Sequence, residues 1–350
     1  MAAPKPPNKR RRTSAEDDAP ESNLQTSNVT RSEDFWFEDG TIVLQAENTQ
    51  FLVHKSVLSR HSVVFSDMFS ILQPENMDDE PSVEGKPLVR VFDTAEDIDQ
   101  LLRALYDRGC DPRRKMPFKV IEVMLRLGNK YDIPHFVAEA TGRLHVEFPT
   151  TLSQWDVQRH WSLPRGGSFR GIKGQKGLLF DIVNLALQYE ISSILPAAYF
   201  LCLRDIDAVL TGTKRDDGSE AILSSDAQRA CIQGRDEILE DIPRQTFQWM
   251  DPTEYSDVCQ NAAVCFRILS YSVVLLWKSG RVTASDAFSQ REQMDAYLDG
   301  GGELCSVCRE TSRFIHSAGR SKMWASLPSY FDLGSWKELE KEDPRKIVDG

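Results

Sequence analysis

Cys305 and Cys308 are the two side chains whose type and spacing come closest to known site chemistry. Two thiols separated by two residues make half of a four-cysteine zinc site, but the chain has no second pair with this spacing. If the segment is helical, Cys308 falls on its apolar face and behaves as a small core residue. We predict this core position and no metal. A metal half-site completed by Cys259, Cys265 or a distant histidine is the alternative, and redox use is a third.

Other reactive groups lack the partners that catalysis needs. A catalytic cysteine requires a positioned base, and the sequence offers no specific one. The glycine-rich segment 165–177 has the first spacing of a phosphate-binding P-loop, but Ile172 stands where the lysine should be. We therefore predict a flexible surface loop there, no catalytic residue and no cofactor. A metal- or thiol-dependent enzyme centred on the paired cysteines is the alternative from another functional class.

Composition sets the broad class. A chain of 350 residues can hold two domains, and 41% hydrophobic with 27% charged residues is ordinary for a globular protein. The net charge of −11 argues against broad non-specific binding to nucleic acid or to an anionic membrane, and because no nucleic-acid recognition motif appears we expect no direct reading of nucleic acid. The most apolar stretch, Phe266 to Trp277, is too short to span a bilayer. Seven scattered cysteines without a signal peptide indicate reduced thiols, and hence the nucleus or cytoplasm.

The elements that would organise the chain lie between residues 35 and 69. Thr41 to Leu44 follows an Asp-Gly turn signal and reads as a strand, and Gln50 to His54 returns as a second strand, so the two predict an antiparallel hairpin. From Lys55 the apolar spacing becomes helical, and Ser62 is a candidate N-cap between two short helices.

These residues resemble the first half of a BTB/POZ domain. The matching stretches are Asp39 to Leu44, Phe51 to Leu58 and Ser62 to Phe65. The resemblance continues through a third strand at 88–93 and through helices up to residue 146, and residues 53–58 and 131–134 are most similar to the BTB proteins of mushroom-forming fungi. It implies an α+β fold, a small sheet capped by helices, that acts as a protein-interaction module.

The resemblance also names interaction residues: His54, Lys55, Met77 and Asp79. Met77-Asp78-Asp79, in an acidic loop at 73–87, is the nearest match to the cullin-recruiting pattern of the family, with Asp in place of Glu. Many animal members carry an Asp where this chain has Thr41, opposite the residue matching Lys55. Thr41 cannot supply that carboxylate, so binding at the family's dimer groove does not carry over.

The predicted domains are a disordered tail at 1–33, the BTB/POZ domain at 34–146, an all-α C-terminal domain at 147–340 and a charged tail at 341–350. The first tail holds a basic cluster that is a candidate nuclear import signal: Lys9, Arg10, Arg11 and Arg12. In the C-terminal domain we predict helices near 179–189, 197–203, 227–239, 255–276 and 304–315, a loop at 211–220, and a closing flap from Trp324 to Trp336.

The sequence thus predicts a non-enzymatic protein–protein interaction module, a scaffold or adaptor. A substrate adaptor for a cullin-type ubiquitin ligase and a nuclear transcription regulator are narrower alternatives. The implied partners are other proteins, among them a second copy of this chain or a cullin.

Overall fold

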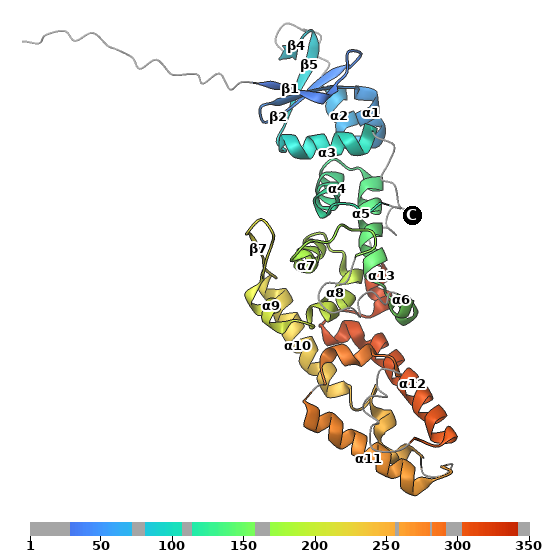
Figure 1. Cartoon of the computed structure of the whole chain (residues 1–350). Helices are drawn as coiled ribbons and strands as arrows, with labels where there is room; N and C mark the ends of the chain where they lie inside the picture. The colour runs from blue at the N-terminus through green and yellow to red at the C-terminus, as the bar shows by residue number, and fades with distance from the viewer. Residues whose placement is uncertain are drawn as a thin grey trace, which may run out of the picture. The chain divides into compact units, whose positions relative to one another are not determined.

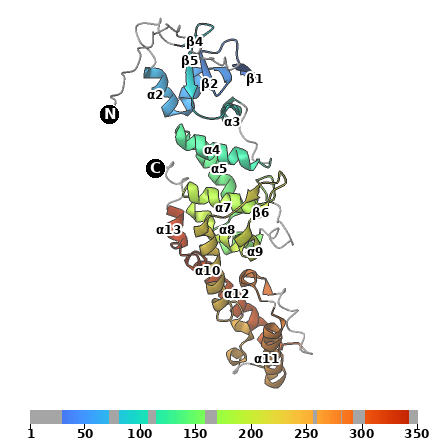
Figure 2. The ribbon, with the colours of Figure 1, turned by 90° about the vertical axis from the view of Figure 1, so that its left-hand side faces the viewer.

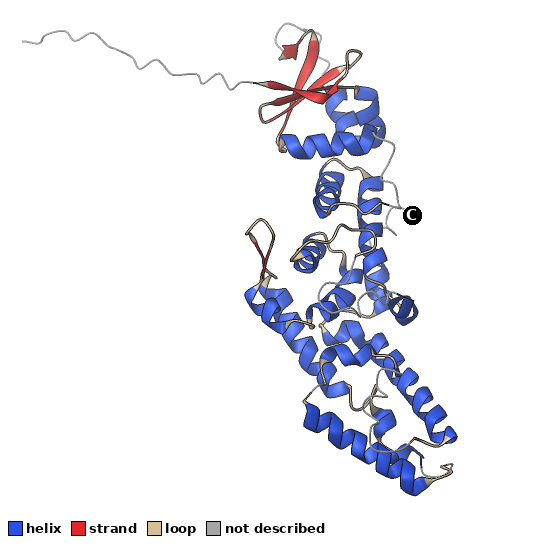
Figure 3. Ribbon diagram, in the orientation of Figure 1, coloured by secondary structure: helices blue, strands red, loops and turns tan. Residues whose placement is uncertain are grey.

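The computed structural model of the chain describes residues 29–71, 81–106, 114–157, 169–255, 259–280, 282–291 and 303–341. The chain divides into two compact units, one made of residues 1–53 and 80–95 and the other of residues 54–79 and 96–350. The first unit holds a β-sheet and the second is built of helices (Figures 1 and 3). This confirms the predicted small sheet followed by a helical region.

The first unit is a five-stranded sheet in the order β1-β3-β2-β5-β4. The predicted hairpin is confirmed: β2 and β3 pair antiparallel across the turn Glu47-Asn48. β1 adds parallel to β3, β5 adds parallel to β2, and β4 closes the edge antiparallel to β5. The strands are β1 Thr30–Trp36, β2 Ile42–Ala46, β3 Thr49–Val53, β4 Ser82–Val83 and β5 Lys86–Val91.

Two strands lie where the sequence predicts none. β1 begins at Thr30, inside the predicted tail, and most of its side chains are exposed. It therefore has no alternating apolar pattern, and its pairing with β3 defines it. β4 and the start of β5 lie in the segment 73–87 that was predicted to be a loop.

The Asp-Gly turn before β2 is as predicted, and a Cβ on Gly40 would stand 2.5 Å from the Leu52 side chain, so glycine is required.

Ser62 separates two short helices as predicted. Its hydroxyl accepts a hydrogen bond from the backbone N–H of Phe65 at 3.0 Å and donates to the carbonyl oxygen of Tyr131. The Phe65 and Tyr131 rings stack at 4.4 Å, so the cap also joins α2 to the segment after α4. These helices are α1 Lys55–His61, α2 Val63–Ile71, α3 Ala95–Tyr106, α4 Phe118–Lys130 and α5 Pro134–Glu147.

The C-terminal region from residue 148 is helical, with one small hairpin (Figure 2). Its helices are α6 Leu152–Val157, α7 Leu178–Gln188, α8 Leu195–Cys202, α9 Ile206–Thr211, α10 Ser225–Asp241, α11 Ala262–Ser279, α12 Ser306–Tyr330 and α13 Trp336–Lys341. Short 3-10 turns are η2 Ser192–Ile194, η3 Gln248–Met250, η4 Pro252–Tyr255 and η5 Ala284–Phe288, and the hairpin strands are β6 Thr213–Lys214 and β7 Glu220–Ala221. Among the described residues, no helix combines the length and apolarity that a membrane crossing requires.

The core of this region is aromatic. Among Trp155, Phe200, Phe288 and Trp324, five ring pairs have centroids 4.7–6.3 Å apart, and Trp336 stacks on Trp324 at 5.7 Å. The prediction of a closing flap from Trp324 is wrong, because α12 continues to Tyr330 and carries Trp324 on its buried face. α6, the first helix of this region, thereby packs against the aromatic core through Trp155.

The buried faces of the last two long helices also differ from the predicted ones. In α11 the spacing of the sequence predicts a buried stripe of Ala262, Phe266, Leu269, Val273 and Leu276. Leu269 is buried as predicted, but Phe266 is 58% exposed and its neighbour Cys265 is buried in its place. In α12 Phe314 is 75% exposed, whereas Cys308 is fully buried as predicted. When a helix has many apolar residues, two sets of them displaced by one position can both show helical spacing. Spacing alone therefore does not decide which of the two sets faces the core.

Candidate functional site

His54 and Lys55, two of the predicted interaction residues, stand at the start of α1. The backbone N–H of His54 donates to the Tyr106 hydroxyl at 2.9 Å, and the same hydroxyl lies 3.1 Å from the His54 Nδ1. A tyrosine hydroxyl accepts one hydrogen bond and donates another, so Tyr106 fixes the start of α1 to the end of α3. The Lys55 Nζ lies 6.0 Å from the centroid of the Phe69 ring. Their use in partner binding stays a prediction.

Several large apolar side chains between residues 29 and 146 are exposed, and three of them are more than half exposed. Ile71, at the end of α2, is 82% exposed, Val63 on the same helix is 57% exposed, and Phe92, directly after β5, is 97% exposed. An exposed phenylalanine or isoleucine contributes favourable binding free energy when a partner protein covers it and removes it from water. Sequence analysis did not single out these residues, because exposure depends on tertiary packing that spacing does not reveal.

Six of the predicted site residues have no described position. Met77 and Asp79, the candidate cullin contacts, lie outside the described residues, as do the candidate import residues Lys9, Arg10, Arg11 and Arg12.

The paired cysteines lie in a cluster of four. The Sγ atoms of Cys259, Cys265, Cys305 and Cys308 all lie within 4.8 Å of one another. Cys259 precedes α11 and Cys265 lies in its first turn, while Cys305 is the N-cap of α12 and Cys308 lies in its first turn. The starts of two helices therefore bring together cysteines about 40 residues apart in the sequence, of which Cys265 and Cys308 are buried.

Backbone N–H groups point at these sulfurs. The N–H of Cys308 lies on the Cys305 Sγ at 3.5 Å, and the N–H of Cys305 lies on the Cys265 Sγ at 3.4 Å. Hydrogen bonds from the backbone of Cys308 and Gln260 lower the pKa of the Cys305 thiol to about 6. Burial raises the pKa of Cys265 and of Cys308. The structure thus places Cys259 and Cys265, two of the residues that the sequence alternative names as possible further ligands, beside the pair.

Comparison with known proteins identifies one N-terminal segment, about a third of the chain. Residues 31–146, which run from β1 to α5, match the BTB/POZ domain family. These residues form a BTB/POZ domain. Such domains are protein–protein interaction modules. No curated protein and no solved structure matches the chain.

The BTB/POZ domain is followed directly by a buried carboxylate. Glu147 accepts hydrogen bonds from the backbone N–H groups of Arg170 at 3.0 Å and Gly171 at 2.6 Å. Burial raises its pKa, and the backbone donors oppose that shift. Ile172 is fully buried, and it bridges to Met116. The prediction of a flexible surface loop over 165–177 is therefore wrong for residues 169–172, which pack against α5.

Glu147→Gln is expected to lower the free energy of unfolding by about 1–2 kcal/mol, because an amide has one acceptor oxygen and leaves a buried N–H without a partner. Urea unfolding measures this change. Glu122→Gln, on α4, is the matched control: its carboxylate pairs with Lys119 at 3.4 Å, both side chains are more than a third exposed, and its loss should cost less than about 0.5 kcal/mol. Equal losses for the two variants would contradict the structural role of Glu147.

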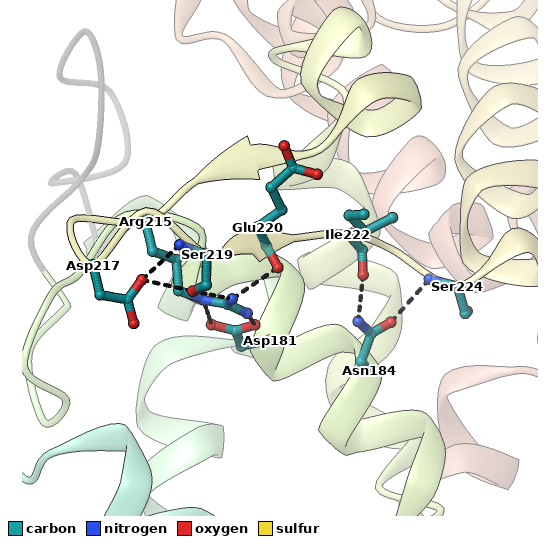
Figure 4. Close-up of polar contacts among 8 residues, drawn as sticks. All are labelled: Asp181, Asn184, Arg215, Asp217, Ser219, Glu220, Ile222 and Ser224. Carbon is teal, nitrogen blue, oxygen red and sulfur yellow. Dashed lines mark hydrogen bonds and ion pairs between the residues drawn. The ribbon is translucent and has the colours of Figure 1, made fainter.

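A second polar cluster holds the β6–β7 hairpin against α7 (Figure 4). Arg215 forms a two-pronged ion pair with Asp181, with Nη2 2.5 Å from Oδ1 and Nε 3.3 Å from Oδ2. Asn184 donates to the carbonyl oxygen of Ile222 at 2.7 Å and accepts from the backbone N–H of Ser224 at 3.0 Å. The segment 211–220 thus contains β6 and the start of β7, so the prediction of a loop is right for the connecting residues 215–219 and wrong for the two strands. These contacts are structural, since each polar group faces the chain itself.

The C-terminal region also contains an apolar cavity of about 690 Å³. α10, the turns η3 and η4, and α11 supply its walls, with Phe247, Met250, Val273 and Leu276 among the apolar side chains. A concave apolar surface of this volume is large enough for side chains of another protein.

Proposed function

We propose that this chain is an adaptor, in which the BTB/POZ domain binds one protein and the C-terminal helical region binds another. The match of residues 31–146 to an interaction module carries the proposal. BTB/POZ domains are typically non-enzymatic, which agrees with the absence of a catalytic motif in the sequence.

Two separate surfaces support an adaptor. In the BTB/POZ domain, the exposed side chain of Phe92 is the described apolar group most available to a partner. In the helical region, the cavity beside Val273 supplies an apolar concave surface. Large aromatic and aliphatic anchors carry most of the binding energy in protein interfaces, so these positions are where a substitution should matter.

Affinity purification of the full-length chain tests this function. With Phe92→Ser, we expect recovery of the protein bound through the BTB/POZ domain to fall at least about tenfold, which corresponds to 1.4 kcal/mol and is typical of an interface anchor. Phe314→Ser is the matched control, because Phe314 is 75% exposed and lies in α12, outside the domain. Quantitative mass spectrometry of the recovered proteins measures the ratio.

The same purification with Val273→Glu tests the second surface. A set of proteins lost from Val273→Glu but retained by Phe92→Ser would be the targets that the adaptor brings to its first partner. If Phe92→Ser and Val273→Glu recover the same proteins in the same amounts as the unaltered chain, the adaptor proposal is wrong.

Two candidates for the protein bound by the BTB/POZ domain are a second copy of this chain and a cullin. Self-association would appear in light scattering of the purified chain as a mass of two chains, and a cullin would appear in the purification. The residues that a cullin role or nuclear import would use, Met77 and Asp79 or Lys9 to Arg12, lie outside the described residues and stay predictions. The resemblance to proteins of mushroom-forming fungi and the assignment to nucleus or cytoplasm stay predictions as well.

A further inference from the structure

The spacing of the four clustered sulfurs fits a single tetrahedral metal ion. Zinc bound by four thiolates at about 2.3 Å places the sulfurs about 3.8 Å from one another. The Sγ atoms of Cys259 and Cys305 are 4.0 Å apart, and all four sulfurs lie within 4.8 Å. Small side-chain rotations therefore bring the set to the geometry of such an ion.

A disulfide does not explain this cluster. A disulfide holds its sulfurs about 2.05 Å apart, and all four cysteines are free thiols. Packing as core residues does not explain it either, since Cys259 and Cys305 are only half-buried. Cysteines that only fill the core do not need hydrogen bonds to their sulfurs. Here the Cys305 and Cys265 sulfurs each accept a backbone N–H group.

The surroundings favour thiolates. Cys305 and Cys308 occupy the N-cap and first turn of α12, which is 25 residues long, and Cys265 lies in the first turn of α11. The amino end of a helix carries a partial positive charge that stabilises an anion. Backbone N–H groups that donate to coordinating sulfurs are also the usual outer contacts that orient metal ligands.

We propose that Cys259, Cys265, Cys305 and Cys308 bind one Zn²⁺ ion that ties the start of α11 to the start of α12. Four thiolates prefer zinc over the hard cations magnesium and calcium, which take oxygen ligands. Binding releases the remaining thiol protons to solvent. Four protein ligands leave no open coordination position, so the site is structural and supplies no catalytic water. The assignment replaces the sequence-based expectation of a metal-free pair.

A zinc ion bound by these four cysteines would hold the starts of α11 and α12 together in the C-terminal region. α11 and α12 meet at their starts through the cluster, and residues 280–305 connect the two helices in sequence. The cavity described above has one wall in α11. Removing the ion should therefore loosen α11 and alter the cavity without affecting the BTB/POZ domain.

Metal analysis of the full-length chain tests the proposal. The chain is produced in zinc-supplemented medium, purified without chelator and analysed by inductively coupled plasma mass spectrometry; we expect one zinc per chain. The double variant Cys305→Ser/Cys308→Ser should contain at most about a tenth of the zinc that the unaltered chain binds. Cys231→Ala is the matched control, because Cys231 is buried in α10 and outside the cluster, and it should keep the full amount.

Cobalt substitution keeps the test decisive if the double variant fails to fold. The unaltered chain, stripped of metal and loaded with Co²⁺, should show the strong visible absorption of a tetrahedral site together with thiolate-to-cobalt charge-transfer bands, and zinc should displace both. A chain with no zinc and no such spectrum overturns the proposal. So does stoichiometric iron or copper in place of zinc, or an equal zinc content in the double variant.

Discussion

Asp156→Ala is expected to lower the free energy of unfolding by about 3 kcal/mol, because it leaves a buried guanidinium without its counter-charge. The Arg320 side chain is only 7% exposed. Its Nη2 lies 2.5 Å from the Asp156 Oδ1 and its Nη1 lies 3.3 Å from Oδ2, so the pair has the two-pronged geometry of the strongest arginine–carboxylate contacts.

The pair joins three distant parts of the chain. Asp156 is in α6, Arg320 is in α12, and the Gln290 side chain after η5 donates to the same carboxylate at 2.8 Å. Arg320 also donates to the carbonyl oxygen of Phe288 at 3.0 Å. Losing the carboxylate therefore affects the packing of α6 on the aromatic core as well as the charge balance.

Urea unfolding followed by tryptophan fluorescence measures the loss. Asp226→Ala is the control, because its ion pair with Arg229 is 3.7 Å long and largely exposed, and such pairs contribute less than about 1 kcal/mol. The double variant Asp156→Leu/Arg320→Met should recover most of the stability, since apolar side chains of similar volume can replace a buried ion pair. A double variant as unstable as Asp156→Ala would show that the charge pair itself is not what matters.

Local signals in the sequence predicted the parts of the fold that local chemistry determines. The β2–β3 hairpin follows from an Asp-Gly turn and two apolar runs, and Ser62 marks the break between α1 and α2 because its hydroxyl can cap only the second. β1 was missed because its side chains are mostly exposed and only its parallel pairing with β3, a long-range contact, makes it a strand.

Long-range contacts also explain what sequence reasoning missed in the C-terminal region. The partners of Asp156 lie 134 and 164 residues away, a separation at which spacing carries no information. The four cysteines are a partial exception. Cys305 and Cys308 have a recognisable spacing, whereas Cys259 and Cys265 have none, so only the fold could show that all four meet.

A close approach of α12 to another segment makes Gly319 irreplaceable. A Cβ at this position would stand 2.2 Å from the carbonyl oxygen of Gln245 and 2.9 Å from the backbone nitrogen of Thr246. Both are main-chain atoms and cannot rotate away. His316, on the same helix, places its Nδ1 3.0 Å from the Thr246 carbonyl oxygen, which holds the two segments at this distance.

Gly319→Ala is therefore expected to destabilise the chain by about 2–3 kcal/mol, although alanine favours a helix by about 1 kcal/mol, because the helix must shift away from residues 245–246. Gly142→Ala is the matched control: Gly142 lies within α5, and its Cβ would meet nothing within 4 Å. There the same substitution should stabilise by about 0.5–1 kcal/mol, since only the helix preference remains. Thermal and urea unfolding of the two variants should give shifts of opposite sign, and shifts of the same sign would contradict the close approach at Gly319.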